Sequence, residues 1–379
     1  MIADRPKPIR VIDFSQVMAG PFCTRLMADI GAEVIKIEPK EGDAMRRRPP
    51  LRGNHSTYFG SLNAGKRSVV LDLRTEDGRQ DAARLVDTAD VLVENFRPGV
   101  MARHGLDWPT LSARNPRLVY CSISGFGQDG SAATRPAYAP MIHATAGLDL
   151  ALMAYQPGLD RPAPTGMFYA DVLAGVYAWG AIQTALLARE HTGQGQMVDV
   201  ALLDSLMSMM VYEYQDAQFP QNRTRHLYTP VKAADGFIMV VPLSDKNFAG
   251  MLALFGEPAW GADPRLSTAA GREANWAEIM SHVEIWAQDR SAQDCERLLL
   301  GVGVPCACYR NVAEVMADPA TRERGVMGTV RDGAGTFQVA NPPFRISSID
   351  AHVRPDIPEL GEGNLEFLTP LQAEPDSTP

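Results

Sequence analysis

The sequence predicts an α/β fold built around a parallel β-sheet, with a second and smaller domain. Three observations lead to this prediction. Apolar strands alternate with short helices through the first half of the chain, 379 residues exceed the usual size of one domain, and the composition turns polar and irregular from Phe219 to Ala234. Strand, helix and strand in succession form a βαβ unit, whose two strands pair in parallel through a right-handed crossover.

The expected elements follow one another regularly in the first half of the chain. The expected strands are Ile9–Ser15, Glu33–Glu38, Ser68–Leu73, Asp90–Phe96, Arg117–Ser124 and Met197–Leu202. Helices are expected over Phe22–Ile30, Thr75–Val86, Thr110–Asn115 and Leu203–Tyr214. Ligands of parallel sheets bind beyond the carboxyl ends of the strands. These ends are Ser15–Ala19, Leu71–Arg74, Asn95–Pro98 and Ser124–Gln128.

The second half of the chain has a different organisation. After a polar linker over Phe219–Ala234, the sequence becomes more helical. Helices are expected over Lys246–Phe255, Asn275–Gln288 and Ala292–Leu300. The stretch from Gly328 to Phe344 alternates like a hairpin, with Asp332-Gly333 at its turn.

Composition narrows the class of protein. The formal net charge of −9 argues against a nucleic acid or an anionic membrane as partner of the whole surface, but leaves room for a local basic patch. Five scattered cysteines indicate a reducing compartment, and the pair Cys306 and Cys308 lacks the further ligands of a zinc site, so no metal is expected. The N-terminus has no apolar signal core, and no window approaches a membrane span, so we expect a soluble cytoplasmic protein.

Asp171 is the most informative residue of the chain. It stands where a loop broken by proline and glycine gives way to a long helix without charge from Val172 to Leu187. Such a helix is typical of a buried core. An aspartate at this place has two interpretations: it caps the helix, or it is a carboxylate nucleophile in an apolar pocket near helix amides.

Two stretches of the sequence resemble phosphate-binding loops. The stretch Gly60–Arg67 nearly matches a Walker loop, but Arg67 replaces the Ser or Thr that holds Mg²⁺, and a strand follows instead of a helix. The stretch Gly125–Gly130 matches G-x-G-x-x-G after a strand, but again no helix follows to hold a pyrophosphate. Neither nucleotide hydrolysis nor NAD binding is expected.

The order of several motifs resembles one family. They are Ala19–Pro39, Gly65–Leu73, Ala89–Gly99, Asn115–Gly130, the Asp171 helix, Thr192–Asp204 and Gly303–Pro319. Over essentially its whole length the chain resembles the family III CoA-transferases, which include formyl-CoA and carnitine-CoA transferases. The resemblance implies a large Rossmann-like domain from residues 1–200 and 325–379, a linker helix over 201–223, and a small α+β domain over 224–324. It also implies that two such chains interlock as a homodimer.

The same resemblance assigns the site. It implies that Asp171 is the catalytic aspartate, and that acyl-CoA is a substrate rather than a permanently bound cofactor. The positions that contact CoA fall on Gln16, Val17, Ala19, Leu71, Arg74, Asn95, Phe96, Arg103 and Tyr138. Several of them lie in the strand ends already identified from the sequence pattern.

The implied chemistry suits a buried carboxylate. Asp171 attacks the donor thioester to give a mixed anhydride, and the released thiolate then forms an aspartyl-CoA thioester that the acceptor acid attacks. An apolar pocket keeps water from these intermediates. Amides after Asp171 and near Gly125–Gly127 are candidate donors to the oxyanions, while Arg74 and Arg103 are candidate partners of the CoA phosphates.

Other charged residues and other functions stay open. Arg46–Arg48 suit a solvated loop or an anion contact, and His143 suits the core better than a general base; Arg46–Arg48 and Arg135 suggest a dicarboxylate such as succinate as donor or acceptor. An α-methylacyl-CoA racemase is the nearest alternative, but its His-Asp pair falls on Tyr138-Ala139 here. A CoA-binding protein without catalysis is the third possibility.

Overall fold

The computed structural model describes residues 8–156, 158–220 and 228–373. The chain divides into two compact units. The first comprises Met1–Gln218 and Ala320–Pro379, and the second Phe219–Pro319. The first unit therefore contains both ends of the sequence, and the second is an insertion into it. All of the site residues expected from the sequence belong to the first unit.

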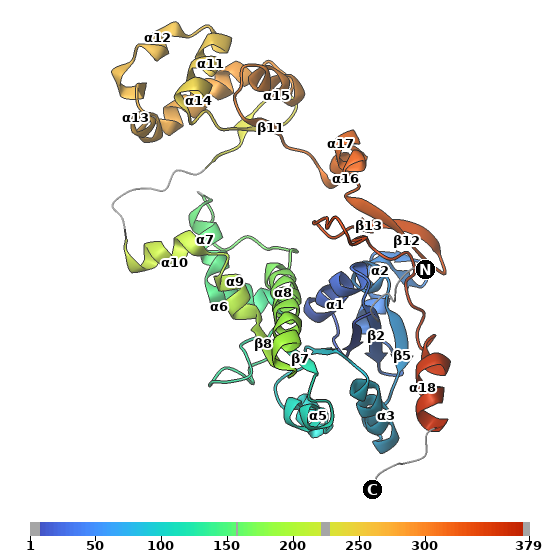
Figure 1. The fold of residues 1–379 in the computed structure, drawn as a ribbon. Coiled ribbons are helices and arrows are strands. Elements are labelled where there is room, and N and C mark those ends of the chain that lie inside the picture. Colours follow the sequence, from blue (N-terminus) through green and yellow to red (C-terminus); the bar gives the residue numbers. More distant parts are fainter. Residues whose placement is uncertain (1–7, 157, 221–227, 374–379) are drawn as a thin grey trace. The chain divides into compact units, whose positions relative to one another are not determined.

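A six-stranded parallel sheet organises the first unit (Figure 1). Its strands are β1 (Arg10–Asp13), β2 (Glu33–Glu38), β5 (Arg67–Val70), β6 (Val91–Glu94), β7 (Val119–Ser124) and β8 (Met197–Ala201). They lie in the order β5-β2-β1-β6-β7-β8. This is the strand order of the Rossmann fold, in which the order reverses between two central strands and leaves a crevice at their carboxyl ends. Here the two strands are β1 and β6. The predicted α/β class and all expected strands of the sheet are confirmed.

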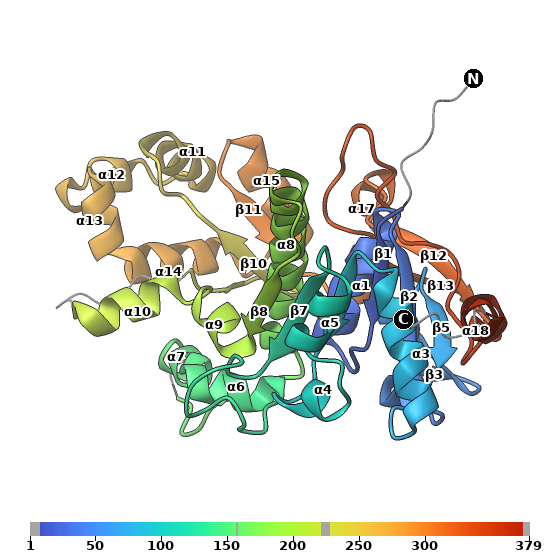
Figure 2. The same cartoon turned by 60° about the horizontal axis from the view of Figure 1, so that its bottom comes forward.

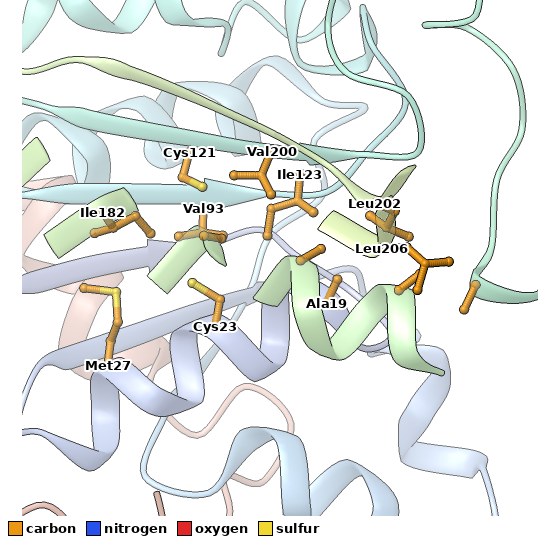
Figure 3. Packing of buried hydrophobic residues seen from close by; sticks show 14 of the residues in the cluster. Ala19, Cys23, Met27, Val93, Cys121, Ile123, Ile182, Val200, Leu202 and Leu206 are labelled. Carbon is orange, nitrogen blue, oxygen red and sulfur yellow. The ribbon is translucent and has the colours of Figure 1, made fainter. Parts of the chain in front are cut away.

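Alternate residues of each strand face opposite layers of helices. Val93 and Cys121 contribute to an apolar cluster with α1 (Ala19–Asp29) and α8 (Tyr169–Thr192), as Figure 3 shows. Leu92 and Tyr120 contribute to a second cluster with α3 (Glu76–Asp87) and α5 (Trp108–Arg114). The sheet is therefore buried on both faces, which agrees with its nearly continuous apolar strands.

The contact between α1 and α8 depends on a small residue. A Cβ atom placed on Gly175 of α8 would lie only 2.7 Å from the carbonyl oxygen of Ala19. Glycine at this position therefore lets α8 approach the first turn of α1. The small residues expected to keep the helix thin do so at the point where the two helices meet.

Shorter elements complete the first unit. They are η1 (Ala44–Arg47), β3 (Leu51–Arg52), β4 (His55–Ser56), α2 (Thr57–Asn63), α4 (Val100–Arg103), α6 (Ala139–Ala146), α7 (Leu148–Ala154), α9 (Leu202–Met207), α10 (Val211–Gln218), β12 (Met327–Asp332), β13 (Gly335–Ala340) and α18 (Asn364–Ala373). The hairpin expected around Asp332-Gly333 is confirmed by the antiparallel pair β12 and β13. Helix α18 packs beside α3 and β5 (Figure 1 and Figure 2).

The expectation of one helix over Leu203–Tyr214 was wrong. The chain forms α9 and α10, separated by a turn at 208–210. Within that turn the Ser208 hydroxyl donates to the Ser205 carbonyl, and the buried Met210 joins the core, so tertiary packing overrides the helical pattern. The expected linker helix over 201–223 corresponds to these two helices as far as Gln218, and its residues 221–223 lie outside the described residues.

The second unit combines a three-stranded antiparallel sheet with helices. The sheet has the order β11-β10-β9, from β9 (Val231–Lys232), β10 (Phe237–Val240) and β11 (Cys306–Cys308). The helices are α11 (Asp245–Phe255), α12 (Pro258–Gly261), η2 (Pro264–Leu266), α13 (Ala269–Ala274), α14 (Trp276–Ala287), α15 (Ala292–Gly301) and α16 (Val312–Ala317); α17 (Pro319–Glu323) leads back to the first unit. The three helices expected in this part of the chain are confirmed as α11, α14 and α15.

Helix α8 has the length and apolar composition of a membrane span, with a mean hydropathy of 1.3, so the expectation that no window approaches a span was wrong. Length and composition alone are weak grounds, because core helices meet the same criterion. In this protein Ala170, Ala174, Ala178 and Ile182 of α8 are buried in the apolar cluster with α1 and the sheet.

Candidate active site

A pocket of about 240 Å³ lies at the crevice where the strand order reverses. It is formed by the chain segments that follow β1, β6 and β7, together with Asp171 at the start of α8 and with Leu202. The expected site residues that line it are Gln16, Val17, Ala19, Asn95, Phe96, Tyr138 and Asp171. The structure therefore brings seven of the ten expected positions to one pocket. They come from the ends of two strands, β1 and β6, and from the starts of three helices, α1, α6 and α8.

Asp171 is the third residue of α8, and Phe168 is the N-cap. The capping interpretation of Asp171 is therefore wrong. The Asp171 carboxylate is half-buried and accepts hydrogen bonds from the backbone amides of Ala19 and of Asp171 itself. Burial raises the pKa of Asp171 to about 6, although the two amide hydrogen bonds oppose this rise. At neutral pH the group is a poorly solvated carboxylate, which is the ionised form that a nucleophile needs.

The Ala19 amide belongs to the first residue of α1. The first amides of a helix have no partner within it, and the N-terminus carries partial positive charge. The Asp171 carboxylate thus lies against the N-terminus of α1 while belonging to the first turn of α8. This placement explains how a largely buried aspartate stays ionised near neutral pH.

The loop between β1 and α1 is held by Asn95. The Asn95 side chain accepts from the Gln16 amide and donates to the Gln16 carbonyl, at 2.8 Å in each case. Val17 follows with a φ of 67°, a left-handed conformation that is unfavourable for a β-branched residue. Such a conformation persists only where surrounding contacts enforce it. Here the contacts of Asn95 fix the residue immediately before it.

A second pocket of about 280 Å³ shares Gln16 and Phe96 with the first. Two further expected positions, Leu71 and Arg74, line it. Lys40 and His104 line it as well, together with the acidic Glu38, Glu41 and Asp72, so side chains of both charges surround this cavity. Its basic side chains are candidate partners of phosphate groups.

Arg74 and Arg103 differ in their present contacts. Arg74 forms a two-pronged ion pair with Asp72 and thereby lowers the pKa of Asp72 to about 2. Arg103 is exposed at the end of α4 and lines neither pocket, although Val100 and His104 on either side of it line the second. Of the ten expected positions, Arg103 alone is not brought into these cavities.

The amides after Asp171 do not serve as free donors. The Val172 amide donates to the carbonyl of Phe168 at 3.1 Å, because Asp171 lies deep enough in the first turn for the next amide to join the helix ladder. That candidate for oxyanion binding was wrong. Gly125, from the other candidate stretch, lines the pocket.

His143 lies in the core, as expected. Its Nε2 accepts from the Ala170 amide at 3.3 Å, and burial lowers its pKa. A neutral imidazole that accepts at Nε2 carries its proton at Nδ1, an atom that is buried and has no hydrogen-bond partner among the residues that the structure describes. His143 does not line the Asp171 pocket. It supports the first turn of α8 instead.

The arginines thought to contact an acceptor acid lie outside the Asp171 pocket. Arg46 pairs with Glu38 and stacks over Phe59, and the Arg47 guanidinium donates to the Glu41 carbonyl. Arg135 stacks over the Phe126 ring at 4.8 Å. Arg48 is exposed. None of these four arginines lines the pocket.

The structure adds residues that the sequence did not single out. Arg97 and Ser124 line the Asp171 pocket, and both stand in strand ends where ligand contacts were expected. Burial raises the pKa of Tyr58 of α2, and the charge of the nearby Asp171 carboxylate raises it further. No sequence signal marks Tyr58, because α2 reaches the site only through the packing of the whole unit.

Neither of the two stretches that resemble phosphate-binding loops has the structure of such a loop. Helix α2 ends at Asn63, before the supposed Walker lysine, and Lys66 itself is buried in the core. Between Gly130 and Tyr138 no helix follows the G-x-G-x-x-G match. Among the residues that the structure describes, no group of three or more His, Cys, Asp or Glu side chains forms a potential metal site.

Comparison with known proteins shows the family of the chain. The sequence profile of CoA-transferase family III matches residues 7–364. The chain is 32% identical to the succinate–glutarate CoA-transferase of Agrobacterium fabrum, over 96% of this chain and 95% of that protein. It is 34% identical to the acetyl-CoA:oxalate CoA-transferase of Acetobacter aceti, over 95% of each. Its fold matches a CaiB/BaiF family protein of Brucella suis with a TM-score of 0.84 and 32% identity, over 97% of this chain and all of that one.

Proposed function

The chain belongs to CoA-transferase family III, and we propose that it moves CoA from an acyl-CoA donor to a small dicarboxylic acid through Asp171. One observation carries the proposal. An ionisable carboxylate with a raised pKa lies in a pocket at the switch point of a Rossmann-type sheet, bound to the N-terminal amide of α1. A second pocket adjoins it, where Lys40, Arg74 and His104 are candidate partners of the CoA phosphates beside acidic side chains.

The proposed reaction begins with acylation of Asp171. A carboxylate oxygen attacks the thioester carbonyl, the C–S bond breaks, and CoA leaves as a thiolate, which gives a mixed anhydride. The thiolate attacks the aspartyl carbonyl and releases the donor acid as a carboxylate. The acceptor carboxylate then attacks the aspartyl thioester, whose C–S bond breaks, and this gives a second mixed anhydride and CoA thiolate. The thiolate attacks the acceptor carbonyl of this anhydride, which forms the acceptor thioester and releases Asp171 as a carboxylate. Every step conserves the thioester energy as long as water is excluded.

The protein positions the reacting groups and limits the access of water to them. The apolar walls of the pocket include Val17, Phe96 and Leu202, which limit the access of water to the anhydride. The Ala19 amide stabilises the carboxylate as it leaves in the last step. Asn95 fixes the loop that carries Gln16, so the donors around the thioester do not need to reorganise.

We propose Arg97 as the partner of the distal carboxylate of a dicarboxylic acid. Arg97 is an exposed cation that lines the same pocket as Asp171, whereas Arg135 stacks over Phe126 outside it. The names of both relatives include dicarboxylic acids, namely succinate, glutarate and oxalate, which supports this substrate class.

The substrate class is tested by steady-state kinetics with succinate, glutarate, acetate and butyrate as acceptors. Arg97→Gln is expected to raise KM for the two dicarboxylates roughly tenfold or more, with a smaller change for the monocarboxylates, because an ion pair to the distal carboxylate is lost. Arg135→Gln is the matched control and leaves all four values unchanged. An equal rise of KM for all acceptors would contradict the dicarboxylate assignment.

The enzymatic alternative is racemisation at the α-carbon of an acyl-CoA. That chemistry needs a base opposite the aspartate, and His143 is buried and accepts a hydrogen bond from the Ala170 amide. The two reactions are separated in deuterium oxide. CoA exchange between acids without incorporation of deuterium at the α-carbon supports transfer, and incorporation without exchange supports racemisation. CoA binding with neither reaction would favour a non-catalytic protein.

The assembly and the compartment are also proposals. We propose that the chain works as an interlocked homodimer, as the family resemblance suggests. We also propose that it works in the cytoplasm, since its five cysteines are free. Sedimentation equilibrium of the full chain at micromolar concentration tests the dimer, and a mass of one chain at that concentration would contradict it.

A further inference from the structure

Asp13 ends strand β1 in a fully buried position that the proposed mechanism does not use. One carboxylate oxygen, Oδ1, accepts from the amide and from the hydroxyl of Ser15. The other, Oδ2, accepts from the Thr24 hydroxyl at 2.7 Å and from Lys66 Nζ at 3.0 Å. A buried charge is tolerated only with such complete pairing. Asp13 therefore joins the start of the loop before α1 to the body of α1.

Lys66 is the cation of this pair and is also fully satisfied. Its Nζ donates to Asp13 Oδ2 and to the carbonyl of Pro21 at 3.0 Å, and to the Asn63 side chain at 2.8 Å. A protonated lysine has three donors, and each has a partner here. Lys66 thereby ties the end of β1 to the first turn of α1 and to the end of α2.

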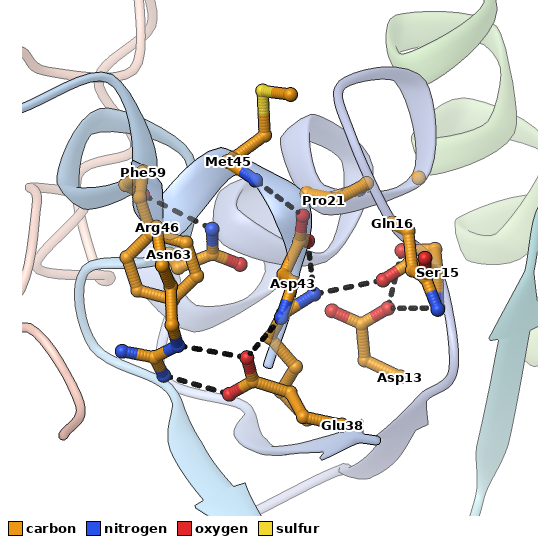
Figure 4. Close-up of polar contacts among 12 residues, drawn as sticks. Asp13, Ser15, Gln16, Pro21, Glu38, Asp43, Met45, Arg46, Phe59 and Asn63 are labelled. Carbon is orange, nitrogen blue, oxygen red and sulfur yellow. Dashed lines mark hydrogen bonds and ion pairs between the residues drawn. The ribbon is translucent and has the colours of Figure 1, made fainter. Parts of the chain in front are cut away.

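A second buried lysine holds the same loop from β2. Lys36 Nζ donates to the Ser15 carbonyl at 2.7 Å and forms an ion pair with Asp43 at 3.1 Å. Behind it, Glu38 accepts from the Asp43 amide and pairs with Arg46 (Figure 4). Both the amide and the carbonyl of Ser15 are thus held by buried charged side chains.

The loop held in this way leads directly to the nucleophile. Ser15 precedes Gln16, which Asn95 clamps, and Val17, which is forced into the left-handed conformation. Space is tight as well, because a Cβ atom on Gly20 would lie 2.2 Å from the Ser15 Cβ atom. The loop ends at Ala19, whose amide binds the Asp171 carboxylate. The position of that amide depends on how Ser15 and Pro21 are anchored on either side.

We propose that the buried pair Asp13–Lys66 positions the Ala19 amide, and with it Asp171, for acylation by acyl-CoA. This inference rests on the proposed function, and neither residue lines the pocket or touches the substrate. Asp13 and Lys66 are positioning residues: they anchor the loop on both sides of the amide that holds the nucleophile.

The test is the single-turnover rate of Asp171 acylation at saturating acyl-CoA, followed by rapid quenching. Lys66→Met keeps about the same side-chain length but removes three hydrogen-bond donors and a positive charge. The acylation rate is expected to fall roughly ten- to a hundredfold, because a displacement on the order of 1 Å at a reacting group has such an effect. Lys66→Arg keeps the charge and several donors and is expected to restore part of the rate.

Arg25→Met is the matched control. Arg25 forms a buried ion pair with Asp29 at 2.9 Å in the same helix, and its guanidinium also donates to the carbonyls of Ser61 and Ala340. Its loss therefore removes buried polar contacts of α1 but none of those described for the loop. Its acylation rate is expected to stay within about twofold of the wild type after correction for the folded fraction, since perturbations away from the reacting groups leave the transition state unchanged.

A milder variant keeps the inference testable if Lys66→Met does not fold. Ser15→Ala removes one hydrogen bond to Asp13 at the loop itself and is expected to slow acylation roughly two- to tenfold, the range of one net hydrogen bond. Wild-type rates in Ser15→Ala and in any folded Lys66 variant would overturn the inference. If wild-type protein forms no adduct on Asp171 at all, the proposed function fails instead, which the wild-type control reveals by itself.

Discussion

The ionised Asp171 carboxylate lowers the free energy of unfolding of the protein, and a neutral substitution should remove this loss. Its pKa in the folded protein is about 6, against an ordinary value of 3.8, because the pocket solvates the carboxylate poorly. The folded state therefore binds the proton more tightly than the unfolded chain. The stability that the protonated Asp171 contributes is therefore fully present below the pKa of this residue in the unfolded chain. It is lost as the pH rises through about 6, the pKa of Asp171 in the folded protein. At neutral pH, wild-type protein is less stable than a variant with a neutral side chain of the same shape.

The magnitude follows from linkage. A shift of one pKa unit corresponds to about 1.4 kcal/mol, so ionisation of Asp171 lowers the free energy of unfolding by about 3 kcal/mol at pH 7.5. At pH 4.5 most of the folded protein already carries the proton, and the same linkage leaves a loss of about 1 kcal/mol. We therefore expect Asp171→Asn to be inactive, and to be more stable than the wild type by about these amounts at the two pH values.

Guanidinium unfolding of the CoA-free protein at both pH values measures this difference. Asp72→Asn is the control with the opposite sign, since Arg74 lowers the pKa of Asp72 and its neutral variant gains no stability. If Asp171→Asn is no more stable than the wild type at pH 7.5, or is equally stabilised at both pH values, the carboxylate is well solvated. The explanation of its reactivity would then fail.

Two further predictions concern the nucleophile and its helix. Because attack needs the ionised carboxylate, kcat/KM for acyl-CoA should rise with pH to a plateau, with half of the plateau value near pH 6; a rate that stays flat from pH 5 to 8 would contradict this. Gly175→Ala should lower the free energy of unfolding by about 1–3 kcal/mol and reduce transfer, since the added Cβ pushes α8 away from Ala19. Gly180→Ala is its control on the same helix: nothing lies within 4 Å of the added Cβ, so a gain of about 0.4–1 kcal/mol is expected, and equal losses in both variants would refute the packing argument.

The sheet and its binding edge were predictable from the sequence. Apolar strands alternate with helices, parallel pairing follows from the crossovers, and ligand sites then fall at the carboxyl ends. The pocket contains residues from the ends after β1, β6 and β7, and the neighbouring pocket contains Leu71 and Arg74 after β5. These positions depend on local pattern and on topology, both of which the sequence carries.

Other features depend on contacts between distant segments and were not predictable. The exact start of α8 placed Asp171 inside the first turn instead of at the cap, and the approach of α2 brought Tyr58 near it. Asp13 and Lys66 are 53 residues apart, so their pairing is invisible in either motif alone. Lys66, which in the sequence stands at the lysine position of a Walker-like stretch, is instead buried in the core and paired with Asp13.

The covalent intermediate on Asp171 is the central claim, and trapping tests it most directly. Wild-type protein is incubated with acyl-CoA in the presence of hydroxylamine, which converts an acyl-aspartyl anhydride or an aspartyl thioester into a stable hydroxamate, and peptides are analysed by mass spectrometry. We predict modification of the peptide that contains Asp171, dependent on acyl-CoA and absent in Asp171→Asn. Full CoA transfer with an unmodified Asp171 peptide would contradict the account.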